Sequence, residues 1–177
     1  MGAGTGAERV LQEWAARGEH RELAGHRVFT MALPPTGPET REPLLVLHGF
    51  PTSSYDFVAV LDALRANRRV LLFDMLGYGL SAKPDCAYTL AMQADIAQAF
   101  VTAAGVERLA LVTHDMGNSV GGELLARNTE GRWPVEVTRR VLTNGSIYID
   151  MAQLTAGQQM LLALPDASLD PAVAPDE

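Results

Sequence analysis

The sequence predicts an α/β fold: a doubly wound, mostly parallel sheet covered by helices on both faces. Short, continuous apolar runs bounded by Pro or Gly recur along the chain, which is typical of strands buried on both faces. Helical stretches of 10–15 residues separate these runs, which indicates βαβ crossovers. With 177 residues, of which 47% are hydrophobic and 20% charged, the chain is long enough for one domain with a sizeable core.

The elements are expected in a regular order. A helix at 7–17 and an extended segment at 27–33 precede a Pro- and Thr-rich loop at 34–43. The expected strands are the apolar runs at 43–49, 68–74, 106–112 and 138–147. Apolar residues at helical spacing predict helices at 57–64, 90–104 and 116–128. From Tyr148 the pattern loosens, with one further helix expected at 155–164.

The composition excludes several classes of function. A net charge of −7 provides no basic field for phosphates, so a nucleic-acid partner is not expected. The single cysteine, Cys86, allows no internal disulfide, and the chain starts without a basic segment followed by an apolar run. No apolar stretch approaches the roughly 20 residues of a membrane span. We therefore expect a cytoplasmic protein without a membrane span.

The segment GYGLSA, at 77–82, matches the dinucleotide fingerprint G-x-G-x-x-[G/A]. That fingerprint works because its last glycines open a helix whose N-terminus faces a pyrophosphate. Here Lys83-Pro84-Asp85 follows at once, and the expected helix begins only near Thr89. We therefore expect no cofactor and no metal, and we attribute the glycines to a sharp turn.

The stretch LALVTHDMGNSVGG, at 109–122, contains two overlapping nucleophile motifs, with either Asp115 or Ser119 at the tip. A nucleophile elbow needs a strand, a strained turn and a helix that starts immediately afterwards. The apolar run ends before His114, which places Asp115 at the tip and Ser119 one turn into the helix. A strand that continued to Ser119 would bury the Asp115 carboxylate, at a cost of several kcal/mol. Asp115 is favoured, and a helix cap without chemistry is its structural alternative.

The segment LHGFP, at 47–51, follows the first buried strand and predicts the other half of a catalytic site. In this architecture the loop after that strand offers one backbone N–H to an oxyanion, and the residue after the nucleophile offers another. These donors would be Phe50 and Met116. Separation in sequence is no obstacle, because sites form where the carboxyl ends of strands meet.

Four blocks, HGFPTSSYDF, DMLGYGLSAKP, LVTHDMG and LTNGSIY, resemble the α/β-hydrolase superfamily over roughly residues 25–150. The nearest branch is the aspartate-nucleophile group of epoxide hydrolases and haloalkane dehalogenases. HGFPTSSYDF and LTNG are most similar to hydrolase-like proteins related to the mammalian mesoderm-specific transcript protein. The resemblance implies that Asp115 attacks an electrophilic carbon and forms an ester, which a histidine-activated water then hydrolyses. The motif-supporting residues would be His48, Gly49, Pro51, His114 and Gly117.

Two departures from the family pattern qualify this expectation. Dehalogenases hold the halide with a tryptophan after the nucleophile and often with an asparagine after His-Gly, where this chain has Met116 and Phe50. The side chains of these two residues cannot donate to a halide, which argues against a dehalogenase. The family's histidine follows its nucleophile, whereas the four histidines here, His20, His26, His48 and His114, all precede Asp115. Some relatives place the acid after the fourth strand, where this chain has Asn144.

The resemblance also implies a division of the chain. The family's core has about eight strands, with a cap inserted after the strand expected at 138–147. We therefore expect 1–147 to form the N-terminal part of the core and 148–177 to begin an incomplete helical cap. A sheet that ended at 138–147 would expose an apolar edge, and this chain alone is expected to show no multiple turnover.

The predicted function is that of an epoxide hydrolase-like enzyme acting on a small epoxide, halide or ester. Two alternatives stay open: a non-catalytic interaction protein that keeps the fold, and an ester or lactone hydrolase that uses Ser119. Nothing in the sequence indicates an oligomeric state.

Overall fold

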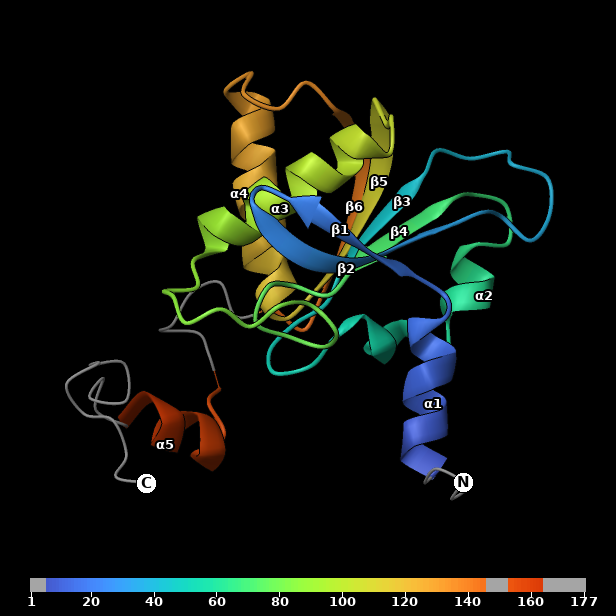
Figure 1. Cartoon of the computed structure of the whole chain (residues 1–177). Helices are drawn as coiled ribbons and strands as arrows, with labels where there is room; N and C mark the ends of the chain where they lie inside the picture. The colour runs from blue at the N-terminus through green and yellow to red at the C-terminus, as the bar shows by residue number, and fades with distance from the viewer. Residues whose placement is uncertain (1–5, 146–152, 164–177) are drawn as a thin grey trace. The chain divides into compact units, whose positions relative to one another are not determined.

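A computed structural model describes residues 6–145 and 153–163. Its centre is one six-stranded sheet in the order β1-β2-β4-β3-β5-β6 (Figure 1). The strands are β1 (Glu19–Leu23), β2 (His26–Leu33), β3 (Leu44–Leu47), β4 (Val70–Phe73), β5 (Arg108–His114) and β6 (Glu136–Thr143). β2 runs antiparallel to both β1 and β4, while β4, β3, β5 and β6 are parallel to one another. The predicted α/β class with a mostly parallel sheet is confirmed.

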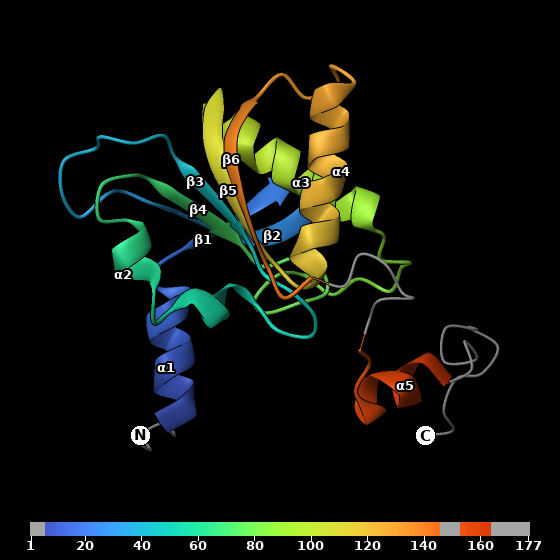
Figure 2. The same ribbon diagram turned by 180° about the vertical axis from the view of Figure 1, so that it is seen from behind.

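Helices lie on both faces of this sheet, with α3 and α4 on one face and α2 on the other (Figures 1 and 2). The helices of this unit are α1 (Gly6–Ala15), α2 (Leu61–Leu64), α3 (Leu90–Ala103) and α4 (Met116–Thr129), with a 3₁₀ turn at Ser54–Phe57. A further helix, α5 (Ala156–Ala163), belongs to a separate unit and is described by itself. The division at 147/148 stays a prediction.

Alternating side chains of the central strands form two apolar layers. Leu45 and Leu47 of β3 are buried in the layer that contains Phe100 of α3 and Leu124 of α4. The intervening residues of β3 are buried in the opposite layer, which contains Trp14 and Leu61. Because both faces are covered, every position of the strand must be apolar, which explains the continuous runs in the sequence.

The helix predicted at 57–64 is wrong as a continuous element. The segment is a 3₁₀ turn followed by the single turn α2, and Val60, expected on the apolar stripe, is 48% exposed. Side-chain contacts organise its start: the Ser54 N–H and hydroxyl both donate to Asp74 Oδ1, and Ser53 Oγ accepts from the Tyr55 N–H. These contacts satisfy N–H groups that have no intrahelical partner at the start of a helical segment.

Among the described residues, the fourth strand is an edge strand with exposed apolar side chains, which is what was expected of a sheet that ends at 138–147. Within the part of the chain that the structure describes, β6 pairs with β5 alone, and Val141 and Leu142 are 53% and 49% exposed. The strand ends at Thr143, and residues 146–147 of the predicted strand lie outside the described residues. Strand β1 was missed because its sequence, EHREL, is charged and largely exposed, and it forms a hairpin with β2.

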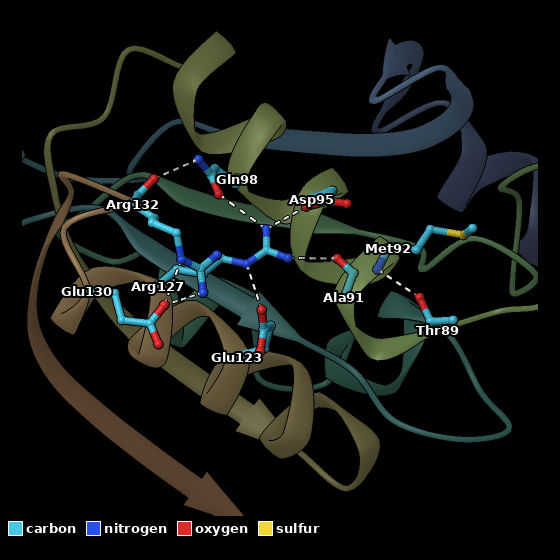
Figure 3. A network of polar contacts seen from close by, with 9 residues as sticks. All are labelled: Thr89, Ala91, Met92, Asp95, Gln98, Glu123, Arg127, Glu130 and Arg132. Atoms are coloured by element: carbon cyan, nitrogen blue, oxygen red, sulfur yellow. Dashed lines mark hydrogen bonds and ion pairs between the residues drawn. The ribbon is translucent and has the colours of Figure 1, made fainter.

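The guanidinium of Arg127 connects α3 with α4 (Figure 3). It donates to Glu123 Oε1 on its own helix at 2.9 Å, and to Asp95 Oδ1 on α3 at 2.5 Å. Further hydrogen bonds reach Gln98 Oε1 and the carbonyl of Ala91. Desolvation opposes the charge, but the hydrogen bonds to Glu123 and Asp95 outweigh it and raise the pKa of Arg127. The network ties the C-terminal part of α4 to α3.

Candidate active site

Asp115 occupies a strained turn between a strand and a helix. β5 ends at His114, α4 begins at Met116, and Asp115 between them has φ 51° and ψ −121°. A non-glycine residue in such a conformation costs about 1–3 kcal/mol and persists only where its surroundings impose it. Ser119, the competing nucleophile, lies inside α4, in the regular part of the helix. The strand–turn–helix geometry of an elbow therefore centres on Asp115.

Two backbone donors converge on one oxygen of Asp115. The N–H of Phe50 donates to Asp115 Oδ1 at 2.9 Å, and the N–H of Met116 donates to the same oxygen at 2.6 Å. Among the described residues, no group hydrogen-bonds to the other carboxylate oxygen, Oδ2. Within the described residues, one carboxylate oxygen is thus held by two backbone donors and the other accepts no hydrogen bond.

Two glycines permit this close approach of loop, strand and helix. A Cβ at Gly49 would lie 2.8 Å from Asp115 Oδ1 and even closer to Asp115 Cβ. A Cβ at Gly117 would lie 2.5 Å from the carbonyl oxygen of His48. Any larger residue at either position would separate the loop after β3 from the start of α4. Pro51, the last residue of the predicted motif, follows Phe50 through a cis peptide bond.

His48 braces the loop after β3. Its Nε2 accepts from the Met75 N–H at 2.9 Å, and its Nδ1 lies 2.9 Å from the Gly49 carbonyl, to which it donates. The ring is 1% exposed, and this burial lowers the pKa of His48. A neutral imidazole with both nitrogens occupied holds the loop and is not free to act as a base.

The other three histidines also make no hydrogen bond to the Asp115 carboxylate. His114 Nδ1 lies 3.1 Å from Thr143 Oγ1 on β6. His20 Nε2 is bonded to the carbonyl of Leu80, and His26 lies in β2 at the antiparallel side of the sheet. None of the four hydrogen-bonds to the Asp115 carboxylate.

Sequence reasoning missed several buried polar residues that support the site. Asp74, directly after β4, accepts from the N–H groups of Ser54 and Leu80 and so ties together the loops after β3 and β4. The side chain of Asn118, in the first turn of α4, bonds to Thr143 of β6 and to the Thr113 hydroxyl. The position of Asp74 at the end of a buried strand was an available signal, whereas nothing in the sequence pattern distinguished Asn118.

Neither a metal-binding cluster nor a membrane-spanning helix occurs among the described residues. Within residues 6–145 and 153–163, no group of three His, Cys, Asp or Glu side chains could hold a metal ion. None of the helices in the described part of the chain is long and apolar enough to cross a membrane.

Comparison with known proteins places this geometry in a family. A family model described as the alpha/beta hydrolase fold matches residues 42–171. The chain belongs to the α/β-hydrolase fold family. The resemblance predicted from the four sequence blocks is thereby confirmed.

Named relatives of this α/β-hydrolase come from bacteria and mammals. The hydrolase LipZ of Mycobacterium tuberculosis is 38% identical over 152 residues, which cover 85% of this chain and 51% of LipZ. The mesoderm-specific transcript homolog protein of Homo sapiens is 35% identical over 147 residues, or 78% of this chain and 43% of that protein. The chain therefore spans about half the length of the curated relatives it matches.

Solved structures give the same picture. The haloalkane dehalogenase DatA from Agrobacterium tumefaciens C58 aligns with a TM-score of 0.61 at 29% identity, over 72% of this chain and 40% of DatA. The epoxide hydrolase CorEH aligns with a TM-score of 0.63 at 21% identity, over 82% of this chain and 48% of CorEH. At that identity, the likeness to CorEH establishes the fold alone.

Proposed function

We propose that this α/β-hydrolase acts through a covalent ester at Asp115, in the manner of an epoxide hydrolase. The observation that carries the proposal is the pair of hydrogen bonds from the Phe50 and Met116 N–H groups to Asp115 Oδ1. A carboxylate suits displacement at a saturated carbon because it is already anionic at neutral pH and needs no base for the first step.

Each carboxylate oxygen has a separate task in this mechanism. Oδ2 attacks the electrophilic carbon, while Oδ1 stays on its two donors and becomes the carbonyl oxygen of the ester. When water adds to that ester, negative charge develops on Oδ1, where the two N–H groups already point. Such donors, fixed before the reaction, stabilise the charge without reorganisation.

The residues around Asp115 favour an epoxide over an alkyl halide. A departing halide needs side-chain donors, and neither Phe50 nor Met116 has one. Haloalkane dehalogenases are nevertheless among the relatives, so the choice between leaving groups is part of the proposal. The cytoplasmic location expected from the sequence stays a prediction.

The first half-reaction tests this proposal because it does not require a general base. No histidine contacts the Asp115 carboxylate, so the ester should accumulate in this chain. The chain is incubated with styrene oxide and followed by intact-mass spectrometry. We expect a gain of one epoxide mass per chain, which peptide mapping assigns to Asp115.

Two variants separate the competing nucleophiles. Asp115→Asn should abolish the mass gain, whereas Ser119→Ala should be labelled by styrene oxide at the wild-type rate. A stable acyl adduct on Ser119 after treatment with 4-nitrophenyl acetate would instead support the serine-type hydrolase. A folded chain that is labelled by neither reagent would contradict the proposal and favour the non-catalytic interaction protein.

A further inference from the structure

The backbone of Asp115 is held on both of its sides. Its N–H donates to the carbonyl of Thr143, the last residue of β6, at 3.1 Å. Its own carbonyl accepts from the N–H of Asn118 at 2.9 Å. A residue other than glycine keeps a φ of 51° only where its surroundings impose it, so these two hydrogen bonds help to set the position of the carboxylate.

The side chain of Asn118 reaches the same carbonyl of Thr143. Asn118 Nδ2 donates to this oxygen at 2.9 Å, so the oxygen accepts from both Asp115 and Asn118. Asn118 Oδ1 accepts from the hydroxyl of Thr113 on β5. One amide group therefore connects β5 and β6 next to the turn that carries the proposed nucleophile.

The place of Asn118 requires its residue type. The residue is fully buried, and a Cβ at Gly145 would overlap with Asn118 Nδ2. Arg140 of β6 donates to the Asn118 carbonyl at 2.7 Å and so holds the main chain at the same point. The side chain must accept from one strand and donate to the other through one short planar group, which an asparagine amide does. An ionised aspartate has no donor, and leucine has neither donor nor acceptor.

Asn128, near the other end of α4, makes a comparable pair of contacts. Its Nδ2 donates to the carbonyls of Trp133 and Val135 at 2.9 and 2.7 Å. These bonds also join α4 to the segment that leads into β6, but roughly 20 Å further along the helix, at 1.5 Å per residue. Asn128 therefore separates a general contribution to stability from an effect on Asp115.

We propose that Asn118 is the positioning residue of the nucleophile, an inference that rests on the proposed function. Through the Thr143 carbonyl it orders the acceptor of the Asp115 N–H, and through its own N–H it holds the Asp115 carbonyl. The carboxylate is thereby kept where the N–H groups of Phe50 and Met116 meet Oδ1. Because Asn118 acts through the backbone of Asp115, it should affect the maximal rate of ester formation and not the binding of the epoxide.

The test compares Asn118→Asp with the matched control Asn128→Asp. Each replaces one amide by a carboxylate of the same size and removes a donor to a main-chain carbonyl. The variants and the wild-type chain are labelled at pH 8 over a range of styrene oxide concentrations, and ester formation is timed by intact mass. Misplacement of a reacting group by about 1 Å costs on the order of 10²-fold in rate. Asn118→Asp should therefore lower the maximal labelling rate about 10²-fold and change the half-saturating concentration less than threefold, whereas Asn128→Asp should change neither by more than threefold.

Hydrogen exchange of the Asp115 amide, followed by NMR, reads the same contact without any chemistry. In the wild-type chain this amide should exchange as slowly as the paired amides of β5. In Asn118→Asp it should exchange at least tenfold faster relative to those amides. In Asn128→Asp the ratio should stay unchanged, because a general loss of stability speeds both alike. Asn118→Leu removes the same donor without adding a charge, should give the same two results, and replaces Asn118→Asp if the new carboxylate prevents folding.

Three results would overturn the inference. Equal slowing of labelling in the variants of Asn118 and Asn128 would mean that Asn118 contributes to stability alone. An unchanged maximal rate in a folded variant of Asn118 would mean that the nucleophile does not depend on it. An Asp115 amide that exchanges in the wild-type chain like an unbonded one would mean that Thr143 does not hold it, a result that needs no variant. Absence of any label on Asp115 in a folded wild-type chain would instead refute the proposed function, and the exchange ratio would then decide by itself whether Asn118 positions the backbone of Asp115.

Discussion

Replacement of Gly49 by alanine should damage the site through a single methyl group. The new Cβ would lie 2.8 Å from Asp115 Oδ1 and 3.0 Å from its Cγ, whereas ordinary contacts at such positions are 3.4–4 Å. The neighbours are not flexible ends: on one side is the loop braced by His48, and on the other the strained turn at Asp115. The loop and the carboxylate must therefore move apart by roughly 1 Å.

That displacement has two measurable consequences. The Phe50 N–H would move from 2.9 Å to beyond hydrogen-bonding distance of Oδ1. A misplacement of about 1 Å at reacting groups costs on the order of 10²-fold in rate. Overpacking of this kind also destabilises proteins by about 1–3 kcal/mol. Gly49→Ala should therefore slow the labelling of Asp115 by about 10²-fold and lower the urea midpoint.

Gly122→Ala is the matched control for Gly49→Ala. Gly122 lies inside α4, and a Cβ there meets nothing within 4 Å. Alanine should stabilise the helix by up to about 1 kcal/mol and leave the labelling rate unchanged. The opposite result would be the same rate of Asp115 labelling and the same urea midpoint in the two variants. In that case the close approach of loop and carboxylate does not govern the site, and the reasoning is refuted.

Three further predictions concern the scaffold. Arg127→Met should lower the free energy of unfolding by about 1–3 kcal/mol, because it removes charged hydrogen bonds to Asp95 and Glu123; urea denaturation measures this. Burial lowers the pKa of His48 below its usual 6.5, so the unfolded chain binds this proton at a higher pH than the folded protein does. Stability should therefore fall as the pH drops below about 6.5. Urea midpoints at pH 8, 6 and 5 measure this fall, and the part of it that His48 causes should be missing in His48→Gln. Val141→Lys, at an exposed position of β6, should reduce aggregation in light scattering without lowering the melting temperature.

The central strands and the elbow could be predicted because several constraints coincide there. β3 and β4 are buried at every position, so only apolar residues fit and the runs stand out in the sequence. Asp115 follows such a run and precedes a helix with small residues, which leaves one place for the turn. The burial pattern of the strand and the position of the turn before the helix therefore both identify Asp115.

Elements that depend on particular side-chain contacts could not be predicted in this way. β1 is stabilised by pairing with β2 rather than by an apolar pattern of its own, so its charged sequence carries no strand signal. The turn at Ser54–Phe57 follows from hydrogen bonds to Asp74, twenty residues further along the chain. Periodicity records which residues face the core, but not which polar group satisfies a given N–H.

The register of the parallel strands explains why the two donors meet. Leu47 of β3 pairs with Thr113 of β5, and the donors Phe50 and Met116 each lie three residues beyond this pair. Because both strands end at the same edge of the sheet, equal steps past the paired residues bring two N–H groups, 66 positions apart in the sequence, to one oxygen. A slip of one residue between β3 and β5 would reverse the faces of the strand and separate the donors at the same time. The apolar residues that set this register are therefore as necessary to the site as the groups that line it.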